Sequence, residues 1–243
     1  MSKVVITPAQ HILILGKTGS WKSIAPKRVF IPQLMQQKKG YLVILDPKRE
    51  YHDVTDVVAH NPRELNEMLY KEDKPVAKII RAVSPEANEE AAEEYLLAAW
   101  GPTTANYDQE SYNPHFSVRF LLEDMPTWYD SSYKTPRQLR NWVTMGRAYE
   151  RTVIGTTQRA QLIPKTLFTM VDHVFVFRIS EYDRKNTIRE YYGTESEARV
   201  ASLEGFDYAL LSDLFDHPVI FKAYTGKQIP KGAIGIELSD EYE

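Results

Sequence analysis

Short apolar runs alternate with helical patterns along most of the chain, and this alternation predicts its secondary structure. Runs of strand length occupy residues 11–15, 41–46, 75–83, 116–124, 151–158, 172–180 and 218–224. Helical patterns lie between them, over residues 22–39, 62–72, 84–100, 135–150 and 164–171. Several strand-length runs are almost continuously apolar, which indicates strands that are buried on both faces. The order therefore predicts an α/β fold, with a mostly parallel central sheet flanked by helices and ligands at the carboxyl ends of the strands.

Prolines mark the expected limits of two helices. Thr135 and Pro136 predict the N-cap and the first residue of the fourth helix. Pro26 is tolerable in the first turn after a glycine loop, whereas Pro32 should kink or end that helix. We find no internal repeat and no low-complexity linker, so we expect a single domain over residues 1–243.

Composition excludes several classes of protein. The chain has 243 residues, of which 43% are hydrophobic and 26% charged, and these are ordinary globular values. It has no cysteine, which excludes disulfides, thiolate metal sites and a cysteine nucleophile. No apolar run reaches the roughly 20 residues that span a bilayer, and the N-terminus lacks the pattern of a signal peptide. We therefore expect a soluble, intracellular protein with no membrane span of its own.

Charge is distributed unevenly along the chain. A net charge of −3 argues against a protein that coats nucleic acid through bulk electrostatics. Residues 51–125 are rich in acidic side chains, whereas residues 137–189 carry a series of arginines and lysines. Two interpretations remain open for the basic segment: solvated helix faces, or a basic face turned to a phosphate backbone or to a neighbouring subunit.

Residues 12–23, "ILILGKTGSWKS", place a glycine loop between a buried strand and a helix. The spacing matches the phosphate-binding pattern G-x-x-x-x-G-K-[ST], except that Trp21 stands at the second glycine. In such a loop backbone N–H groups bind phosphate oxygens, Lys22 reaches the β- and γ-phosphates, and the Ser23 hydroxyl ligates Mg²⁺. The motif predicts a P-loop NTPase that binds ATP and Mg²⁺. The expected nucleotide-binding residues are Gly16, Lys17, Thr18, Gly19, Ser20, Trp21, Lys22 and Ser23.

Trp21 is the departure from this motif. If the position needs a positive φ, a bulky residue there is strained by on the order of 1–3 kcal/mol. The backbone N–H is retained, however, and an indole that points away from the loop could pack on the helix or stack on a base. Three interpretations stay open: a tolerated natural variant, a relative that does not hydrolyse, or an engineered substitution. We expect a retained nucleotide site, because the lysine, the serine and the other loop glycines are intact.

Four further segments resemble the FtsK–HerA superfamily of DNA-translocating ATPases. "GYLVILDPKREY" (40–51) resembles its second strand, which commonly ends in an Asp-Pro-Lys-Gly-Glu-Tyr-like turn, and "VRFLLED" (118–124) resembles its Walker B strand. "MGRAYERTVIGTTQR" (145–159) and "VDHVFVFRIS" (171–180) resemble the two strands that follow. The likeness covers about residues 10–190 in the family's order, and residues 191–243 are then expected to complete the fold.

The resemblance also implies partners. The chain lacks the membrane region and winged helix of FtsK and the N-terminal barrel of HerA, and a bare ATPase core of this length is similar to the genome-packaging ATPases of tailless icosahedral viruses with internal membranes. Such a relationship implies double-stranded DNA, a homo-oligomeric ring (a pentamer or hexamer) and capsid vertex or portal proteins as partners. It places the protein in the virion or the host cytoplasm.

Two acidic residues carry the implied Walker B role. By resemblance, Glu123 holds Mg²⁺ through water together with Ser23, and Asp124 orients the attacking water. The family usually shows the order Asp-Glu, so Glu123-Asp124 is a departure for which slow hydrolysis is a plausible consequence. The alternative is an aspartate that caps the end of a strand.

The resemblance assigns two more catalytic residues. Gln158 lies at the tip of a strand near the γ-phosphate, and Arg147 is the first choice for an arginine that acts on the neighbouring subunit, with Arg151 and Arg159 next. The plain alternatives are a loop glutamine and surface salt bridges.

The remaining aromatic and histidine residues give weaker signals. None of the six histidines has metal-ligand spacing, and His173 reads as a core residue of an apolar strand. Tyr107, Tyr112 and Trp128 flank loops, including 101–114, that could line a DNA channel, but aromatic surface packing explains them equally well.

Three functions compete. The leading one is an ATP-driven translocase for double-stranded DNA, in particular a viral genome-packaging ATPase. The second is a conjugation- or segregation-type DNA motor. The third is a non-hydrolysing nucleotide- or DNA-binding subunit that is disabled by Trp21.

Overall fold

The computed structural model describes ten segments of the chain, namely residues 4–6, 9–20, 22–32, 40–70, 77–101, 116–129, 134–205, 207–213, 217–221 and 236–238. Tyr107, Tyr112 and nearly all of the loop expected at 101–114 lie outside these residues. In the described part of the chain, no helix combines the length and apolarity that crossing a membrane requires.

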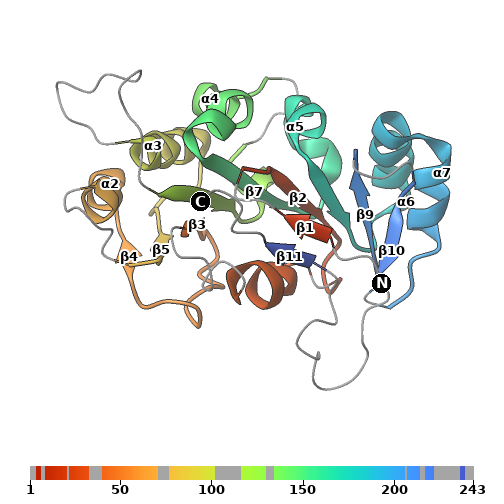
Figure 1. The fold of residues 1–243 in the computed structure, drawn as a ribbon, viewed down its shortest axis with the longest axis horizontal. Helices are drawn as coiled ribbons and strands as arrows, with labels where there is room; N and C mark the ends of the chain where they lie inside the picture. The colour runs from red at the N-terminus through yellow and green to blue at the C-terminus, as the bar shows by residue number, and fades with distance from the viewer. Residues whose placement is uncertain are drawn as a thin grey trace.

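A nine-stranded sheet forms the centre of the protein, in the order β10-β9-β8-β2-β7-β6-β3-β5-β4 (Figure 1). The seven strands from β8 to β4 in this order are mutually parallel, and β9 and β10 add to the β8 edge in antiparallel fashion. The predicted mostly parallel α/β sheet is therefore confirmed. Its strands are β2 (Ile12–Leu15), β3 (Gly40–Leu45), β4 (Val58–Ala59), β5 (Ile79–Ala82), β6 (Ser117–Leu122), β7 (Arg151–Thr157), β8 (His173–Val176), β9 (Tyr208–Ser212) and β10 (Val219–Phe221). A separate parallel pair joins β1 (Val4–Ile6) to β11 (Ile236–Leu238).

Helices cover both faces of the sheet. One face packs against α2 (Pro62–Tyr70), α3 (Glu89–Trp100), α4 (Arg137–Met145), α5 (Lys165–Met170) and α7 (Arg189–Ala201). The opposite face packs against the helix that follows β2, which includes the π-helical turn η1 (Pro26–Phe30). Figure 1 shows α3, α4 and α5 along one side of the sheet and this orange-red helix on the other. The near-continuous apolar strands are explained by this two-sided burial.

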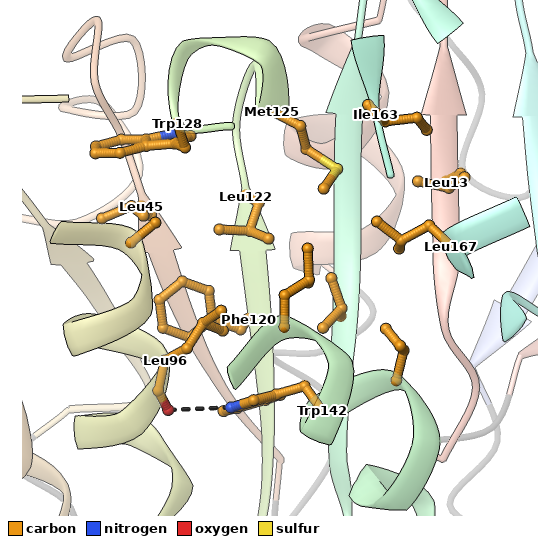
Figure 2. Close-up of a cluster of buried hydrophobic side chains, with 14 of the residues drawn as sticks. Leu13, Leu45, Leu96, Phe120, Leu122, Met125, Trp128, Trp142, Ile163 and Leu167 are labelled. Atoms are coloured by element: carbon orange, nitrogen blue, oxygen red, sulfur yellow. Dashed lines mark hydrogen bonds between the residues drawn. The ribbon is translucent and has the colours of Figure 1, made fainter. Parts of the chain in front are cut away.

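Large side chains fill the core between β6 and the helices. Phe120 of β6 packs edge-on against Trp142 of α4, with their ring centroids 5.6 Å apart. The Trp142 indole N–H donates to the Leu96 carbonyl oxygen of α3 at 3.0 Å, as Figure 2 shows. This contact satisfies the polar end of a fully buried indole, which fixes α3 and α4 relative to each other and to the strand.

The start of α4 differs from the sequence prediction. The helix begins at Arg137, because Pro136 has extended dihedrals (φ −56°, ψ 156°) and no side chain of its own segment caps the helix. Instead the Glu93 carboxylate of α3 accepts the N–H groups of Gln138 at 2.5 Å and Leu139 at 3.1 Å. The assignment of Thr135 as N-cap was therefore wrong, since a carboxylate from another helix takes that role.

The hydrophobic pattern predicts no helix over residues 181–201, yet the structure has three helical segments there: α6 (Glu181–Asp183), the π-helical η5 (Arg184–Ile188) and α7. Ser180 caps α6 by accepting the Asp183 N–H at 3.0 Å. The π turn and Gly193, whose φ of 82° interrupts α7, break the 3.6-residue periodicity that a sequence pattern depends on.

Candidate active site

The predicted site residues follow four strands of the sheet. The glycine loop follows β2, the turn 46–51 follows β3, Glu123 and Asp124 follow β6, and Gln158 follows β7. These strands are parallel, so their carboxyl ends meet at one edge. The topology therefore brings together residues that are far apart in the sequence, at the place where open α/β folds bind ligands.

The glycine loop is anchored on the two strands beside β2. The Gly16 N–H donates to the Thr157 carbonyl oxygen at 3.0 Å, and the Lys17 N–H donates to that of Arg178 at 2.9 Å. A Cβ on Gly16 would lie 2.3 Å from the Ser20 hydroxyl oxygen and 3.0 Å from the Phe177 Cβ, so a side chain there would force its neighbours to move. Gly19 has a φ of +74°, with no atom near the place a Cβ would take. The loop has the tight turn and the open backbone that phosphate binding needs.

Trp21 lies outside the described residues. Its effect on the phosphate site, and the choice among the three interpretations of it, therefore remain predictions from the sequence.

Lys22 and Ser23 converge on Glu123. The Lys22 ammonium nitrogen lies 3.3 Å from Glu123 Oε1, and the Ser23 hydroxyl donates to the same oxygen at 3.1 Å. Lys22 is 5% exposed and Glu123 1% exposed, so this is an ion pair removed from water. Lys22, Ser23 and Glu123 thus form one cluster, in which Lys22 and Glu123 are buried and Ser23 is half-buried.

The second oxygen of Glu123 has a different partner. The Tyr51 hydroxyl donates to Glu123 Oε2 at 2.8 Å, from a ring that is fully buried. Burial, followed by the charge and hydrogen bond of Glu123, raises the pKa of Tyr51 well above its ordinary value. The Tyr51 hydroxyl therefore stays protonated at neutral pH and can donate to Glu123.

Trp128 supports the same residue from the core. Its indole N–H donates to the Glu123 carbonyl oxygen at 3.0 Å, and the side chain is only 2% exposed. A role in lining a DNA channel, or in surface packing, is thereby excluded for Trp128. The hydrophobic residues around it, in Figure 2 Met125 and Leu45, place it under the tip of β6.

Asp124 adopts a left-handed backbone conformation, with φ 52° and ψ 61°. Its N–H donates to the Thr156 hydroxyl at 2.9 Å, and its carboxylate accepts the Thr127 hydroxyl at 3.2 Å and the Lys48 ammonium. The hydrogen bond to Asp124 is the main cause that raises the pKa of Lys48. A non-glycine residue at positive φ costs of order 1 kcal/mol and is often found at functional sites.

Gln158 lies beside the glycine loop, where the Thr18 hydroxyl donates to its Oε1 at 2.7 Å. Arg159 is exposed next to it. Both side chains are therefore at the edge where phosphates would bind, and their catalytic roles remain predictions.

The other two arginines lie elsewhere. Arg147 follows α4 and precedes β7, at the opposite edge of the sheet from the glycine loop, and its guanidinium donates to Asp172 Oδ1 at 2.6 Å. Arg147 therefore lies away from the glycine loop of its own chain. A catalytic role for this residue requires that it reaches the glycine loop of a neighbouring subunit. Arg151 is fully buried and donates to the carbonyl oxygens of Trp100 and Phe116, which is a structural position.

Residues of the turn 46–51 were not predicted as site residues. Asp46 accepts the N–H groups of Glu50 at 2.9 Å and Tyr51 at 3.0 Å, which closes the turn and aims Tyr51 and Lys48 at β6. The signal that could have identified them is topological: this turn ends the strand next to the Walker B strand. The sequence alone does not show which side chain of this turn contacts the residues that follow β6.

His173 is a core residue, as predicted. It is fully buried, and its Nδ1 lies 3.0 Å from the Ser212 hydroxyl. In the described part of the chain no three histidine, aspartate or glutamate side chains gather in a way that could hold a metal ion. A site for Mg²⁺ would draw on Ser23 and Glu123, with phosphates and water completing the shell, which is the usual mode of this ion. The Ser23 hydroxyl oxygen and Glu123 Oε1, 3.1 Å apart, fit that mode.

The fold and the glycine loop define a P-loop NTPase. The family model of the central domain of the helicase HerA matches residues 6–145, and the chain belongs to this family. The resemblance to FtsK–HerA ATPases is thereby confirmed.

Solved structures share the fold. The genome-packaging NTPase B204 of Sulfolobus turreted icosahedral virus 2, in complex with ATP-gammaS, is 16% identical with a TM-score of 0.73, over 89% of this chain and 98% of that one. VirB4 of Thermoanaerobacter pseudethanolicus is 10% identical with a TM-score of 0.58, over 89% and 90% of the two chains. The cytoplasmic domain of the type VII secretion ATPase EccC of Thermomonospora curvata is 14% identical with a TM-score of 0.51, over 90% of this chain and 24% of that one. No curated protein matches the sequence.

Proposed function

We propose that this protein is an ATP-driven translocase of double-stranded DNA, and in particular a viral genome-packaging ATPase. The observation that carries the proposal is the convergence of Lys22, Ser23 and Glu123 behind a glycine loop, with Asp124 at the same edge. The likeness to B204, over nearly the whole of both chains, supports the packaging role.

The residues have distinct roles in this proposal. Lys22 exchanges Glu123 for the β- and γ-phosphates, and the loop N–H groups bind the phosphate oxygens. When bound, Mg²⁺ would neutralise the charge of the phosphates. Ser23 would hold this ion directly, and Glu123 would hold it through water. Asp124 orients the water that attacks the γ-phosphate, and Gln158 contacts that phosphate from the tip of β7. The contacts of Lys22 and Ser23 with Glu123 support the first of these roles, and the family resemblance supports those of Asp124 and Gln158.

Assembly and partners follow from the motor function. We propose a homo-oligomeric ring, a pentamer or hexamer, in which Arg147 of one subunit completes the site of the next. DNA contacts would be largely to the phosphate backbone and would weaken steeply with salt. A packaging motor works on capsid vertex or portal proteins, in the virion or the host cytoplasm.

ATPase measurements with purified protein test this function. We expect Mg²⁺-dependent hydrolysis of ATP that double-stranded DNA stimulates at low salt, and its loss in Lys22→Ala. Arg63→Ala, which removes an exposed cation from an ion pair within α2, beside the edge strand β4, is the matched control and should retain turnover. Absence of turnover at high protein concentration, with or without DNA, would contradict the proposal.

A second candidate is a motor of the conjugation, segregation or secretion type, which the fold shared with EccC favours. A secretion motor predicts ATP hydrolysis without stimulation by naked double-stranded DNA. A conjugation or segregation motor would share that stimulation and is distinguished from a packaging ATPase by the genes that lie beside its own. The non-hydrolysing alternative is tested by Trp21→Gly: a large gain in turnover would show that the indole restrains catalysis, and equal rates would show that the loop tolerates it.

A further inference from the structure

The proposed mechanism uses Glu123 and Asp124 but leaves open what holds them in place once nucleotide binds. We propose that the turn 46–51 is a positioning element of the ATPase site, in which the Tyr51 hydroxyl fixes Glu123 and the Lys48 ammonium fixes Asp124. The inference rests on the proposed ATPase function. It gives a role to two residues of the segment 40–51 to which the sequence analysis assigned none.

The two oxygens of Glu123 have separate partners, so one oxygen can keep its partner when nucleotide engages the other. Oε1 contacts Lys22 and Ser23, the two groups that phosphate and Mg²⁺ engage. Oε2 contacts the Tyr51 hydroxyl. When Lys22 turns to a phosphate, the bond from Tyr51 remains and keeps Oε1 directed at Ser23. A buried carboxylate without such a donor would lose its orientation.

Tyr51 is itself held rigidly. Its ring is fully buried, with the Lys27 ammonium 5.1 Å from the ring centroid, and its N–H donates to Asp46. Asp46 lies 3.4 Å from the buried Arg81 guanidinium, which fixes the base of the turn to β5. The Glu123 N–H donates to the Leu45 carbonyl oxygen at 3.2 Å, so the sheet sets the spacing between turn and carboxylate. Rigid elements of this kind are what positioning of a reactive group requires.

Lys48 acts on Asp124 from the same turn. Its ammonium contacts the Asp124 carboxylate, which also accepts the Thr127 hydroxyl. The cation offsets the repulsion between two adjacent carboxylates and directs Asp124 while its backbone is held at positive φ. Lys48 is 43% exposed along its side chain, so its contribution is smaller than that of Tyr51.

Tyr51→Phe tests the inference, because it removes one hydroxyl and keeps the buried ring. The matched control is Tyr95→Phe, which removes a hydroxyl that donates to the Val83 carbonyl oxygen at 2.7 Å, away from the glycine loop. We measure kcat, KM, nucleotide affinity by calorimetry, half-saturation by Mg²⁺, and Tm. Loss of an outer partner of this kind costs about 10- to 100-fold in activity.

The expected result is a kcat lowered about 10-fold or more in Tyr51→Phe, with a higher Mg²⁺ requirement and an ATP affinity within about twofold of the unmodified protein. Tyr95→Phe should retain kcat even if its Tm falls as much. Lys48→Met should lower kcat less than Tyr51→Phe does. Lys48→Arg keeps the positive charge and should retain the kcat of the unmodified protein.

Two results overturn the inference, and they are distinguishable. If the unmodified protein hydrolyses ATP and Tyr51→Phe has the same kcat and Mg²⁺ requirement, or loses no more than Tyr95→Phe, the positioning role fails and the ATPase function stands. If the unmodified protein shows no turnover, the proposed function and the inference both fail.

Discussion

Glu123 is the residue on which the site depends, because three donors meet a carboxylate that is almost without access to water. Burying an ion pair is costly, and it is tolerated where each charge has a partner. Lys22 and Glu123 satisfy one another in the absence of nucleotide, and phosphates would take over Lys22 on binding. Stability and function are therefore coupled at a single pair of side chains.

Glu123→Gln separates these two effects. The change leaves Lys22 as a buried charge with only a neutral partner, so we expect the nucleotide-free protein to lose about 3 kcal/mol of unfolding free energy. Mg-ATP should raise the unfolding free energy of Glu123→Gln by more than it raises that of the unmodified protein. Turnover should be lost in the variant. Urea unfolding with and without Mg-ATP measures both effects, and Glu94→Gln, at an exposed position of α3, is the control. Equal stabilisation by ATP in both proteins would contradict this account of the pair.

Residue types in the phosphate loop could be predicted from the sequence, and side-chain contacts between strands could not. Lys22 and Ser23 follow from the spacing of a local motif, and Glu123 follows from the resemblance of residues 118–124 to a Walker B strand. The role of Tyr51 could not be predicted in this way, because Tyr51 and Glu123 lie 72 positions apart and follow two neighbouring parallel strands. Which residue of a turn crosses to the neighbouring strand is decided by how Asp46 closes that turn.

At the scale of the elements, the start of α4 shows how a helix is fixed by a partner. Glu93 of α3 binds two N–H groups that the first turn leaves free, and burial raises its pKa while these bonds lower it. Glu93→Ala should therefore destabilise the protein by about 1–2 kcal/mol. Chemical denaturation checks this, with the exposed neighbour Glu94→Ala expected within about 0.5 kcal/mol of the unmodified protein. A loss no larger than that of Glu94→Ala would exclude the cap.

The same elements show where sequence patterns succeed. Most strands of the central sheet were predictable, because two covered faces demand continuous apolar runs, as in β2, β3 and β8. The sequence analysis did not predict β4 or β9. The first residue of α4 was not predictable, because the residue that caps the helix, Glu93, lies 45 positions away along the chain. The segment 181–201 was missed because η5 and Gly193 disturb the helical period.

At the scale of the whole molecule, two buried histidines set a pH dependence. Burial is the main cause that lowers the pKa of His11 and of His173 to about 4, with the nearby Arg147 charge adding to it. Unfolded histidine titrates near 6.5, so between pH 6.5 and 4 the unfolded chain binds protons that the folded protein does not. Folding is thus fully favoured above pH 6.5 and loses stability as the pH falls toward 4.

The expected slope is up to about 1.4 kcal/mol per pH unit for each histidine. Burial raises the pKa of Asp172, and this acts in the opposite direction at pH values above the ordinary pKa of aspartate. Urea unfolding at pH 7.5, 6 and 5 measures the slope, and His173→Asn should reduce it, whereas removal of the exposed His217 should not. A stability that stays constant from pH 7.5 to 5 would contradict the burial of these rings.

The proposed ring adds a prediction about Arg147, which lies on the far edge of the sheet from its own glycine loop. Arg147→Ala and Lys22→Ala should each lack turnover alone. Mixed together they should recover part of it, because one subunit then supplies the arginine and its neighbour supplies the lysine. Mixtures without any recovery would exclude a role for Arg147 between subunits.

Binding of nucleotide by the loop after β2 is the claim from which the motor function follows, and calorimetric titration of the full chain with ATP in the presence of Mg²⁺ tests it most directly. We predict saturable uptake of one nucleotide per chain by the protein with Trp21 in place, and a marked loss of affinity in Lys22→Ala. An absence of binding by the unmodified protein, or equal binding by Lys22→Ala, would contradict the account.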